Sequence, residues 1–174
     1  MATPRPLISA ARIRARVRAL GRRIAADYRG LDLHLIGVLH GSFVFMADLV
    51  REIDLPMTCD FLRASSYGAG TTSRGRAKIT SDFDRPIRGR DVLLVEDIVD
   101  TGITASAVLE RLGKRGPSSL RLCALLHKPS RTRVPVTVDY VGFTVPDKFV
   151  VGYGLDYDAR YRNLPYIGIL GKEA

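Results

Sequence analysis

The sequence predicts an α/β protein of the doubly wound type, in which strands and helices alternate along the chain. Two short apolar runs, 33–39 and 92–95, have the pattern of strands buried on both faces, and each is followed by a turn with glycine and the start of a helix. A third buried strand is predicted at 120–130. The length of 174 residues suits one domain, so we treat 1–174 as a single unit.

The N-terminal segment predicts a helix. Between residues 7 and 28, apolar side chains recur at helical spacing with arginines between them, and Gly30 marks the end. We expect the arginine face to be solvated surface, and an arm that binds RNA is the alternative. The strand that follows, 33–39, contains His34, to which we assign no chemistry.

A short turn, His40-Gly41-Ser42, joins that strand to an apolar helix from Phe43 to about Ile53. Ligands collect at the carboxyl ends of strands in such units, so this turn is a candidate anion-binding loop. Residues 57–65 alternate apolar and polar side chains, as a half-exposed strand does.

Residues 65–78 are rich in Gly, Ser and Thr, carry three basic side chains and show no apolar periodicity. Loops of this length in a compact domain are uncommon unless they are functional. We therefore predict a mobile lid over a site, with Ser66 and Tyr67 at its hinge. The alternative is a long surface hairpin loop without a role.

The stretch from Val92 to Ser106, VLLVEDIVDTGITAS, is the most informative part of the sequence. Glu96 and Asp97 follow the predicted strand, and the turn at 100–104 leads into a helix that runs to about residue 112. The turn's N–H groups and the positive end of the helix would stabilise the same anion. Two adjacent carboxylates favour a ligand that also brings ribose hydroxyls and Mg²⁺, such as a sugar phosphate. The alternative is an ordinary surface turn with a capped helix.

One lysine has an unusual place in this pattern. Lys128 lies at the carboxyl end of the strand predicted at 120–130, and Pro129 fixes the backbone after it. This placement suits an ammonium group that is presented to one ligand atom. A snorkelling surface lysine is the alternative.

The last part of the chain holds another alternating strand, predicted at 134–145, and then a tyrosine-rich segment at 146–170. That segment contains Phe149 beside a short apolar run, followed by Asp156 and Arg162. The tyrosines are most simply a packing surface with polar tips.

Composition narrows the class of protein. The chain is 46% hydrophobic and 26% charged, which is ordinary for a soluble globular domain, and no apolar run approaches the roughly 18 residues of a membrane span. Cys59 and Cys123 have no close Cys or His neighbours, so we predict two buried free thiols. The N-terminal stretch has no apolar core of a secretory leader, and we expect a cytoplasmic protein.

The net charge of +9 raises the possibility of a nucleic-acid partner. No aromatic residues interleave with the basic ones as a stacking surface for bases requires. We attribute the charge mainly to attraction of polyanionic small substrates.

The stretch from Val92 to Ser106 resembles the phosphoribosyl pyrophosphate (PRPP) signature of the type I phosphoribosyltransferases. The strings SSYG, VEDIVDTGIT, LLHKPS, VGF, PDKFVVGYGLDY and YRNLPYIG narrow the resemblance to the bacterial hypoxanthine (hypoxanthine-guanine) phosphoribosyltransferases. The resemblance implies a type I phosphoribosyltransferase fold, with a central, mostly parallel sheet flanked by helices. It also implies a small hood from the chain termini, at about 1–30 and 146–174.

The family reaction is purine salvage. It transfers the 5-phosphoribosyl group of PRPP to a 6-oxopurine, and the resemblance implies that hypoxanthine gives IMP, that guanine gives GMP, and that pyrophosphate is released. The chemistry is dissociative, so the site must stabilise charge and exclude water. Mg²⁺ is the implied cofactor.

The resemblance also implies a role for each matching residue, with Asp100 as the general base that accepts the purine proton. The residues implied for PRPP are Glu96, Asp97, Asp100, Thr101, Gly102, Ile103 and Thr104. Those implied for pyrophosphate are His40, Gly41 and Arg162. Those implied for the purine are Lys128, Phe149, Val150 and Asp156, and those for the metal are Glu96, Asp97 and Asp156.

Two of these positions set expectations of their own. His40 stands where the family usually has Lys or Arg, so pyrophosphate contact would rest more on the backbone and on other arginines. Lys128 would donate to the exocyclic oxygen of the purine, which favours hypoxanthine and guanine over adenine.

The alternatives are a xanthine-guanine phosphoribosyltransferase and an RNA-binding transcriptional regulator of the same fold. The strings around Lys128 and Phe149 argue against the first, and a regulator could dispense with both side chains. Members of the family form dimers and tetramers, so we expect a homo-oligomer of either size. The sequence does not choose between hypoxanthine and guanine.

Overall fold

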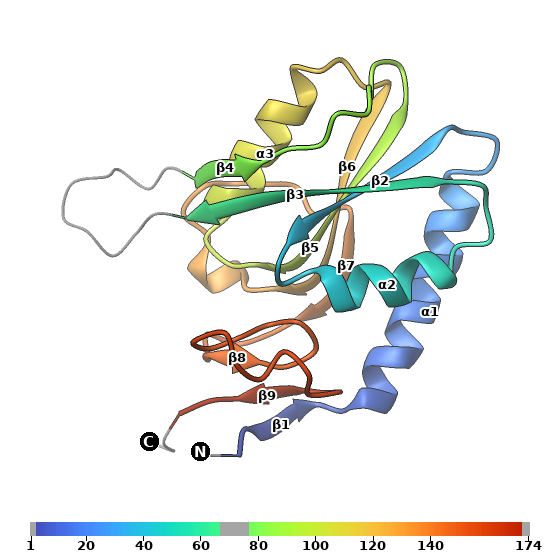
Figure 1. Ribbon diagram of the computed structural model, residues 1–174. Coiled ribbons are helices and arrows are strands. Elements are labelled where there is room, and N and C mark those ends of the chain that lie inside the picture. The colour runs from blue at the N-terminus through green and yellow to red at the C-terminus, as the bar shows by residue number, and fades with distance from the viewer. Residues whose placement is uncertain (1–2, 67–76, 172–174) are drawn as a thin grey trace.

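The computed structural model of the protein describes residues 3–66 and 77–171. Strands and helices alternate along much of this chain, as Figure 1 shows. The elements are, in order, β1 (Arg5–Ile8), α1 (Ala10–Asp27), β2 (Leu33–Leu39), α2 (Phe43–Arg51), β3 (Thr58–Ser66), β4 (Ala77–Ser81), β5 (Asp91–Val99), α3 (Ile103–Gly113), β6 (Ser119–His127), the 3-10 turn η1 (Pro129–Arg131), β7 (Tyr140–Thr144), β8 (Val150–Val151) and β9 (Ile167–Ile169).

Six of the described strands form one sheet in the order β4-β3-β2-β5-β6-β7. All neighbours in it are parallel except β3 and β4, which are antiparallel. Parallel strands bring their carboxyl ends to one edge, so the turns after β2, β5 and β6 meet there. The prediction of a central, mostly parallel sheet flanked by helices is confirmed.

Helices cover both faces of this sheet. On one face, α1 and α2 pack against alternate residues of the central strands, such as Leu35 of β2 and Leu93 of β5. On the other face, α3 packs against the residues between them, such as Ile36 and Leu94. These four side chains are fully buried, and burial of each contributes about 1.5–3 kcal/mol. The two apolar layers therefore fix the sheet and the turns at its edge.

The remaining described strands form a small sheet in the order β1-β9-β8. Both pairs are antiparallel, with Arg5 and Val150 on either side of Ile169. The sheet thus joins strands from opposite ends of the chain, and Figure 1 shows it below the larger sheet. From the first thirty residues, β1 joins the small sheet, whereas α1 lies against α2 and β7.

Two predicted boundaries are wrong. Leu7 and Ile8 belong to β1 and not to the first helix, because the chain there pairs with β9 and the side chain of Ser9 caps a helix that begins at Ala10. The central strand does not end at Val95 but runs to Val99, so Glu96 and Asp97 lie inside β5. Pairing with β6 continues through that segment and holds it extended.

The strand predicted at 134–145 is also too long. It covers only Tyr140–Thr144, because Pro135 has no N–H group to donate and Val134 donates instead to the backbone oxygen of Thr101. The segment before β7 therefore lies against the turn after β5.

The two cysteines are free thiols, as predicted. Cys123 is buried, but Cys59 is exposed, so its predicted burial is wrong. Cys59 pairs with the buried Leu35 of β2, but the start of β3 is less covered than β2, and Thr58 and Asp60 are partly exposed as well. Among the described residues, no helix combines the length and the apolar character needed to cross a membrane.

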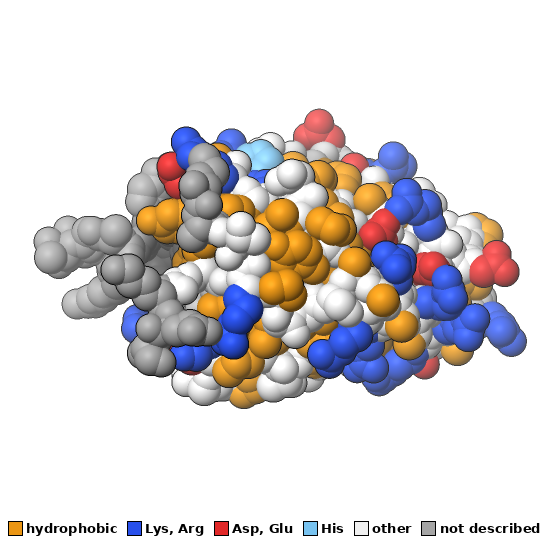
Figure 2. Space-filling view, turned by 90° about the horizontal axis from the view of Figure 1, so that it is seen from below, with side chains coloured by type: hydrophobic (Ala, Val, Ile, Leu, Met, Phe, Trp, Pro, Cys, Tyr) orange, Lys and Arg blue, Asp and Glu red, His pale blue; other side chains and the backbone are white. Residues whose placement is uncertain are grey.

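Three arginines of α1, exposed as a solvated face requires, also have partners on β7. Arg16 donates to the backbone oxygens of Val141 and Gly142, at 2.7 Å each. Arg12 lies over the Phe143 ring, and Arg23 lies over the Tyr140 ring. Figure 2 shows Lys and Arg side chains gathered on the side where α1 lies. These guanidinium groups cover the exposed edge of β7.

Candidate active site

The turn after β5 is built to hold an anion. Gly102 has a φ of 81°, and a Cβ atom there would lie 2.1 Å from the backbone oxygen of Val134, so only glycine fits. Helix α3 starts at Ile103 without a side-chain cap at Gly102, and only a long hydrogen bond of 3.5 Å joins the Ile103 N–H to Oγ1 of Thr101, so the first turn still offers N–H groups. Thr101 and Thr104 flank this position. An anion there would be bound by N–H groups and by the positive end of the helix.

Two carboxyl groups lie beside this turn, within β5. Glu96 is 4% exposed, and its Oε1 atom is buried without a hydrogen-bond partner among the described residues. Burial, together with the charge of Asp97, raises the pKa of Glu96 well above its usual range. Burial also raises the pKa of Asp97 to about 6. A cation bound beside Glu96 and Asp97 would lower both pKa values and favour the ionised carboxylates.

The loop after β2 touches this acidic pair. A Cβ atom on Gly41 would lie 1.7 Å from Oδ2 of Asp97, so the backbone of the loop packs directly against that carboxylate. On its other side, the backbone oxygen of Gly41 would lie 2.2 Å from a Cβ atom on Gly154. His40 precedes Gly41 in the same loop. The neighbouring strands β2 and β5 thus bring the candidate anion loop and the acids together.

Asp156 and Arg162 lie in the segment between β8 and β9. Arg162 donates to the backbone oxygen of Gly154 at 2.6 Å and pairs with Asp156 at 2.7 Å. Asp156 also accepts a hydrogen bond from the N–H of Ala159 at 2.8 Å. Arg162 lowers the pKa of Asp97 and Asp156 raises it, which places both near that carboxyl group. The guanidinium group of Arg162 therefore already has two partners within the protein, whereas a side chain that only binds pyrophosphate would be free of them.

Lys128 and Phe149 meet where the small sheet begins. Lys128 is only 6% exposed and donates from Nζ to the backbone oxygen of Lys148 at 2.7 Å. The ring of Phe149, the next residue, is 52% exposed and has the edge of the Tyr157 ring 5.6 Å away. Val150 is buried at the start of β8. An exposed aromatic face thus lies next to a buried ammonium group.

The predicted lid can be followed only at its two ends. Ser65 and Ser66 pair with Lys78 and Ala77, so these ends of 65–78 belong to strands β3 and β4. Tyr67 lies in 67–76, outside the described residues.

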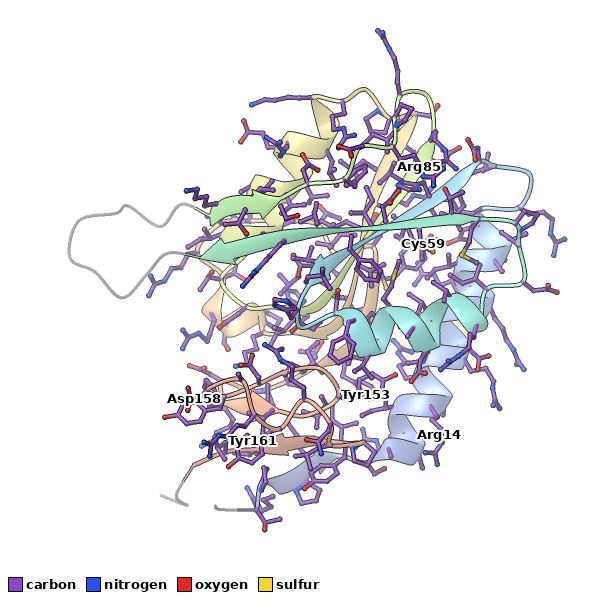
Figure 3. The ribbon with its side chains drawn as sticks, viewed as in Figure 1. Arg14, Cys59, Arg85, Tyr153, Asp158 and Tyr161 are labelled. Carbon is purple, nitrogen blue, oxygen red and sulfur yellow. The ribbon has the colours of Figure 1, made fainter. Side chains whose placement is uncertain are left out.

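Sequence reasoning missed two residues that touch this region. Arg131, at the end of η1, lies 2.9 Å from Asp100 and 3.3 Å from Asp147. Tyr153 donates its hydroxyl hydrogen bond to Asp48 of α2 at 2.5 Å, and Figure 3 shows it between the small sheet and α2. A single arginine at the end of a short 3-10 turn has no sequence pattern that marks it as functional. The contact of Tyr153 joins two residues that are far apart in the sequence.

The residues fit a Mg²⁺ ion that arrives with a phosphorylated ligand. Oxygen donors are present in Glu96, Asp97 and Asp156, and the unpaired Oε1 of Glu96 lacks a partner within the described part of the chain. In that part, no group of three or more His, Cys, Asp or Glu side chains is arranged to hold a metal alone. Mg²⁺ is commonly held by one or two carboxylates and by phosphate oxygens, so these two observations agree.

Replacing Glu96 with glutamine is expected to stabilise the free protein at high pH. Because the folded-state pKa of Glu96 is raised, the folded protein keeps a proton that the unfolded chain releases, and stability falls as pH rises above the ordinary value of 4.5. Glutamine removes this loss, so Glu96→Gln should melt at a higher temperature than wild type at pH 8. Thermal melts between pH 5 and pH 8 should show the gap widening with pH.

The exposed Glu110 provides the control, because Glu110→Gln removes a carboxylate whose pKa is lowered by Lys114. Its melting temperature should not rise relative to wild type as pH increases. An equal Tm difference for Glu96→Gln at pH 5 and pH 8 would contradict the argument.

Comparisons with known proteins agree with this geometry. The family model of the phosphoribosyl transferase domain matches residues 9–158. The hypoxanthine phosphoribosyltransferase of Salmonella typhimurium is 54% identical over 164 residues, covering 93% of this chain and 92% of that protein. The hypoxanthine-guanine phosphoribosyltransferase of Mycobacterium tuberculosis is 51% identical over 170 residues, covering 94% and 84%. A crystal structure of a hypoxanthine phosphoribosyltransferase from Staphylococcus aureus superimposes with a TM-score of 0.91 at 43% identity, covering 95% and 90%.

Proposed function

The chain belongs to the phosphoribosyl transferase domain family, and from this premise we propose that it is a purine-salvage enzyme that transfers the 5-phosphoribosyl group of PRPP to hypoxanthine. The products are IMP and pyrophosphate. The observation that carries the proposal is the arrangement of three turns at one sheet edge. The anion turn after β5 lies between the Gly41 loop after β2 and Lys128 after β6. The relatives named above support this reaction over xanthine-guanine transfer and over RNA-dependent regulation.

In the proposed mechanism, the 5-phosphate of PRPP is bound by the N–H groups from Thr101 to Thr104. The ribose hydroxyls face Glu96 and Asp97, and the pyrophosphate lies over the backbone at His40-Gly41 with Arg162 beside it. The chemistry that Mg²⁺ would supply is neutralisation of charge on the pyrophosphate. Glu96, Asp97 and Asp156 are the residues that would hold it.

The base pocket is formed by the turn after β6 and by the residues at the start of β8. The purine stacks on Phe149, its edge meets the backbone of Val150, and Lys128 donates to its exocyclic oxygen. The ammonium group has three donors, and one is used on Lys148, so two remain for the ligand. Adenine has an amino group at that position and cannot accept, which gives the preference for 6-oxopurines.

Chemistry requires a proton acceptor beside the purine imidazole ring. Asp100 follows β5 directly and adjoins the phosphate turn, so it is the carboxylate placed between phosphate and base. As the ribose gains oxocarbenium character, the carboxylates under it stabilise positive charge. We assign to the small sheet, with residues 146–171, the role of a hood, and to 65–78 the role of a lid that excludes water.

Cellular context and assembly are part of the proposal. Free thiols at Cys59 and Cys123 support a reducing, cytoplasmic location.

Exposed Phe43 and Phe61 support a homo-oligomer, dimer or tetramer, in which these rings are covered. Light scattering coupled to size exclusion would give the mass, and a monomer at micromolar concentration would contradict this part.

The test of the function is a spectrophotometric assay with PRPP and Mg²⁺ that offers hypoxanthine, guanine, xanthine and adenine separately. Turnover of hypoxanthine, abolished by a chelator and not seen with adenine, is the expected result. No turnover of any purine would overturn the enzyme assignment. Guanine and xanthine rates then define the range of substrates.

Replacing His40 with lysine is expected to tighten pyrophosphate several-fold. A lysine brings a full positive charge to the loop that touches Asp97, whereas a neutral histidine supplies one hydrogen bond. The measurement is the inhibition constant of pyrophosphate against PRPP. An unchanged constant would show that backbone contacts alone hold the leaving group.

A further inference from the structure

Arg131 links the proposed proton acceptor to the start of the base pocket. Its Nε atom lies 2.9 Å from Oδ1 of Asp100, and its Nη1 atom donates to Oδ1 of Asp147 at 3.3 Å. One guanidinium group therefore bridges the carboxylate after β5 and the carboxylate two residues before Phe149.

The two oxygens of Asp100 differ in their surroundings. Oδ1 is buried and accepts no hydrogen bond of regular geometry from the described residues, and its near neighbour is Nε of Arg131, an ion-pair contact at 2.9 Å. The side chain as a whole is 37% exposed, so its open edge lies on the side of Oδ2. An aspartate on a turn would otherwise sample several rotamers, and contact on one oxygen restricts the direction of the other.

The backbone around Arg131 is tied to the same turn. Arg133 and Val134 donate to the backbone oxygen of Thr101, at 2.9 and 3.0 Å, and Arg131 itself donates to the backbone oxygen of Lys128 at 3.1 Å. Arginine and aspartate thus sit on segments that are hydrogen-bonded to each other. An exposed ion pair contributes little stability in general, so the effect of the Arg131–Asp100 pair is to orient the Asp100 side chain.

The purine-contacting lysine shares this support. Lys128 donates to the backbone oxygen of Lys148, and Arg131 donates to the carboxylate of Asp147. Two side chains from one short segment therefore grip two consecutive residues at the entrance of the base pocket. Movement of either would shift the acceptor relative to the base.

We propose that Arg131 is the positioning residue for Asp100: it holds Oδ1 and leaves Oδ2 directed at the imidazole N–H of the bound purine. The inference rests on the proposed phosphoribosyl transfer. In the step, one ring nitrogen bonds to the anomeric carbon, and the C–O bond to pyrophosphate breaks with its electron pair leaving on oxygen. The N–H proton of the other ring nitrogen passes to Oδ2 of Asp100.

The test compares Arg131→Met with Arg131→Lys in single-turnover experiments with enzyme in excess of purine. Arg131→Met keeps length and loses the charge, and its rate with hypoxanthine should fall about 10- to 30-fold, with the PRPP dissociation constant changed less than about threefold. Arg131→Lys should recover most of the rate. Arg133→Met is the matched control, since it removes the same charge from the same segment, and it should keep the wild-type rate.

A second substrate separates positioning of the acceptor from general support of the fold. In 8-azahypoxanthine, an added ring nitrogen makes the N–H more acidic, so the step depends less on the acceptor. The loss in Arg131→Met should therefore be several-fold smaller with this substrate than with hypoxanthine. Equal losses with both substrates, or weaker PRPP binding at an unchanged rate, would overturn the inference.

The controls separate a failure of the proposed function from a failure of the proposed role of Arg131. Wild-type protein that fails to convert either purine would refute the proposed function. Active wild-type protein with an unaffected Arg131→Met rate would refute only the role of Arg131. If Arg131→Met gives no folded protein by circular dichroism, Arg131→Gln, which also loses the charge but keeps a polar head group, carries the test with the same pair of substrates.

Discussion

Replacing Asp100 with asparagine is expected to slow phosphoribosyl transfer about 10²- to 10⁴-fold. Asparagine has nearly the same shape but cannot accept the purine proton. The N–H groups that we propose to bind the phosphate belong to the backbone from Thr101 to Thr104, so PRPP affinity should stay within a few-fold of wild type. The measurements are a single-turnover rate with hypoxanthine and calorimetric titration with PRPP.

Asp147→Asn is the matched control for this substitution. It also removes a negative charge from beside Arg131, but it keeps the Oδ1 acceptor of the 3.3 Å hydrogen bond and does not touch the proton path. Its rate should remain within about threefold of wild type. A wild-type rate for Asp100→Asn would remove Asp100 from the role of general base and leave the proton to solvent.

The second large effect is expected for Gly41→Ala, in which kcat/KM for PRPP should fall about 10²-fold. The new Cβ atom would lie 1.7 Å from Oδ2 and 2.4 Å from Cγ of Asp97, so the loop or the carboxylate must move. A displacement of about 1 Å at positioning groups can cost this much in rate. Because Gly154 touches the other side of Gly41, the loop has little room to retreat.

Gly113→Ala is the control for a glycine-to-alanine change at the end of α3 that lies away from the anion turn. A Cβ atom at Gly113 has nothing within 4 Å, and this position at the end of α3 should accept alanine with unchanged kinetics. Initial rates across PRPP concentrations, for both variants at saturating hypoxanthine, make the comparison. A normal KM for PRPP in Gly41→Ala would show that the Asp97 carboxylate is free to shift without loss.

The sequence predicted the parts of this protein that depend on local pattern. Apolar runs located β2, β5 and β6, and glycine with hydroxyl residues located the turn at 100–104, because both signals lie within a few neighbouring residues. Ends of strands were predicted less well. Whether Glu96 stays in β5 depends on its pairing with Ala124 of β6, which no local pattern contains.

Contacts between distant segments explain the other differences. Leu7 and Ile8 have helical spacing, but β9 offers them a partner more than 150 residues away, and the pairing prevails over the local preference. The contact of the exposed Arg16 with the backbone of β7 could not be predicted either, because the two segments are far apart along the chain. For the same reason, the family resemblance could suggest Arg162 as a ligand but not its existing pairing with Asp156 and Gly154.

The order of strands in the small sheet has a consequence for synthesis on the ribosome. Its middle strand, β9, is the last of the described strands along the chain, and its partner β1 is made much earlier, whereas β8 shortly precedes it. Residues emerge in order at about 5–20 per second, so the larger sheet and its phosphate turn can assemble while β1 and β8 still lack a neighbour. A nascent chain would therefore acquire the sugar-phosphate half of its site before the purine half. Chaperone capture of stalled chains should be released only when Ile167–Ile169 becomes available.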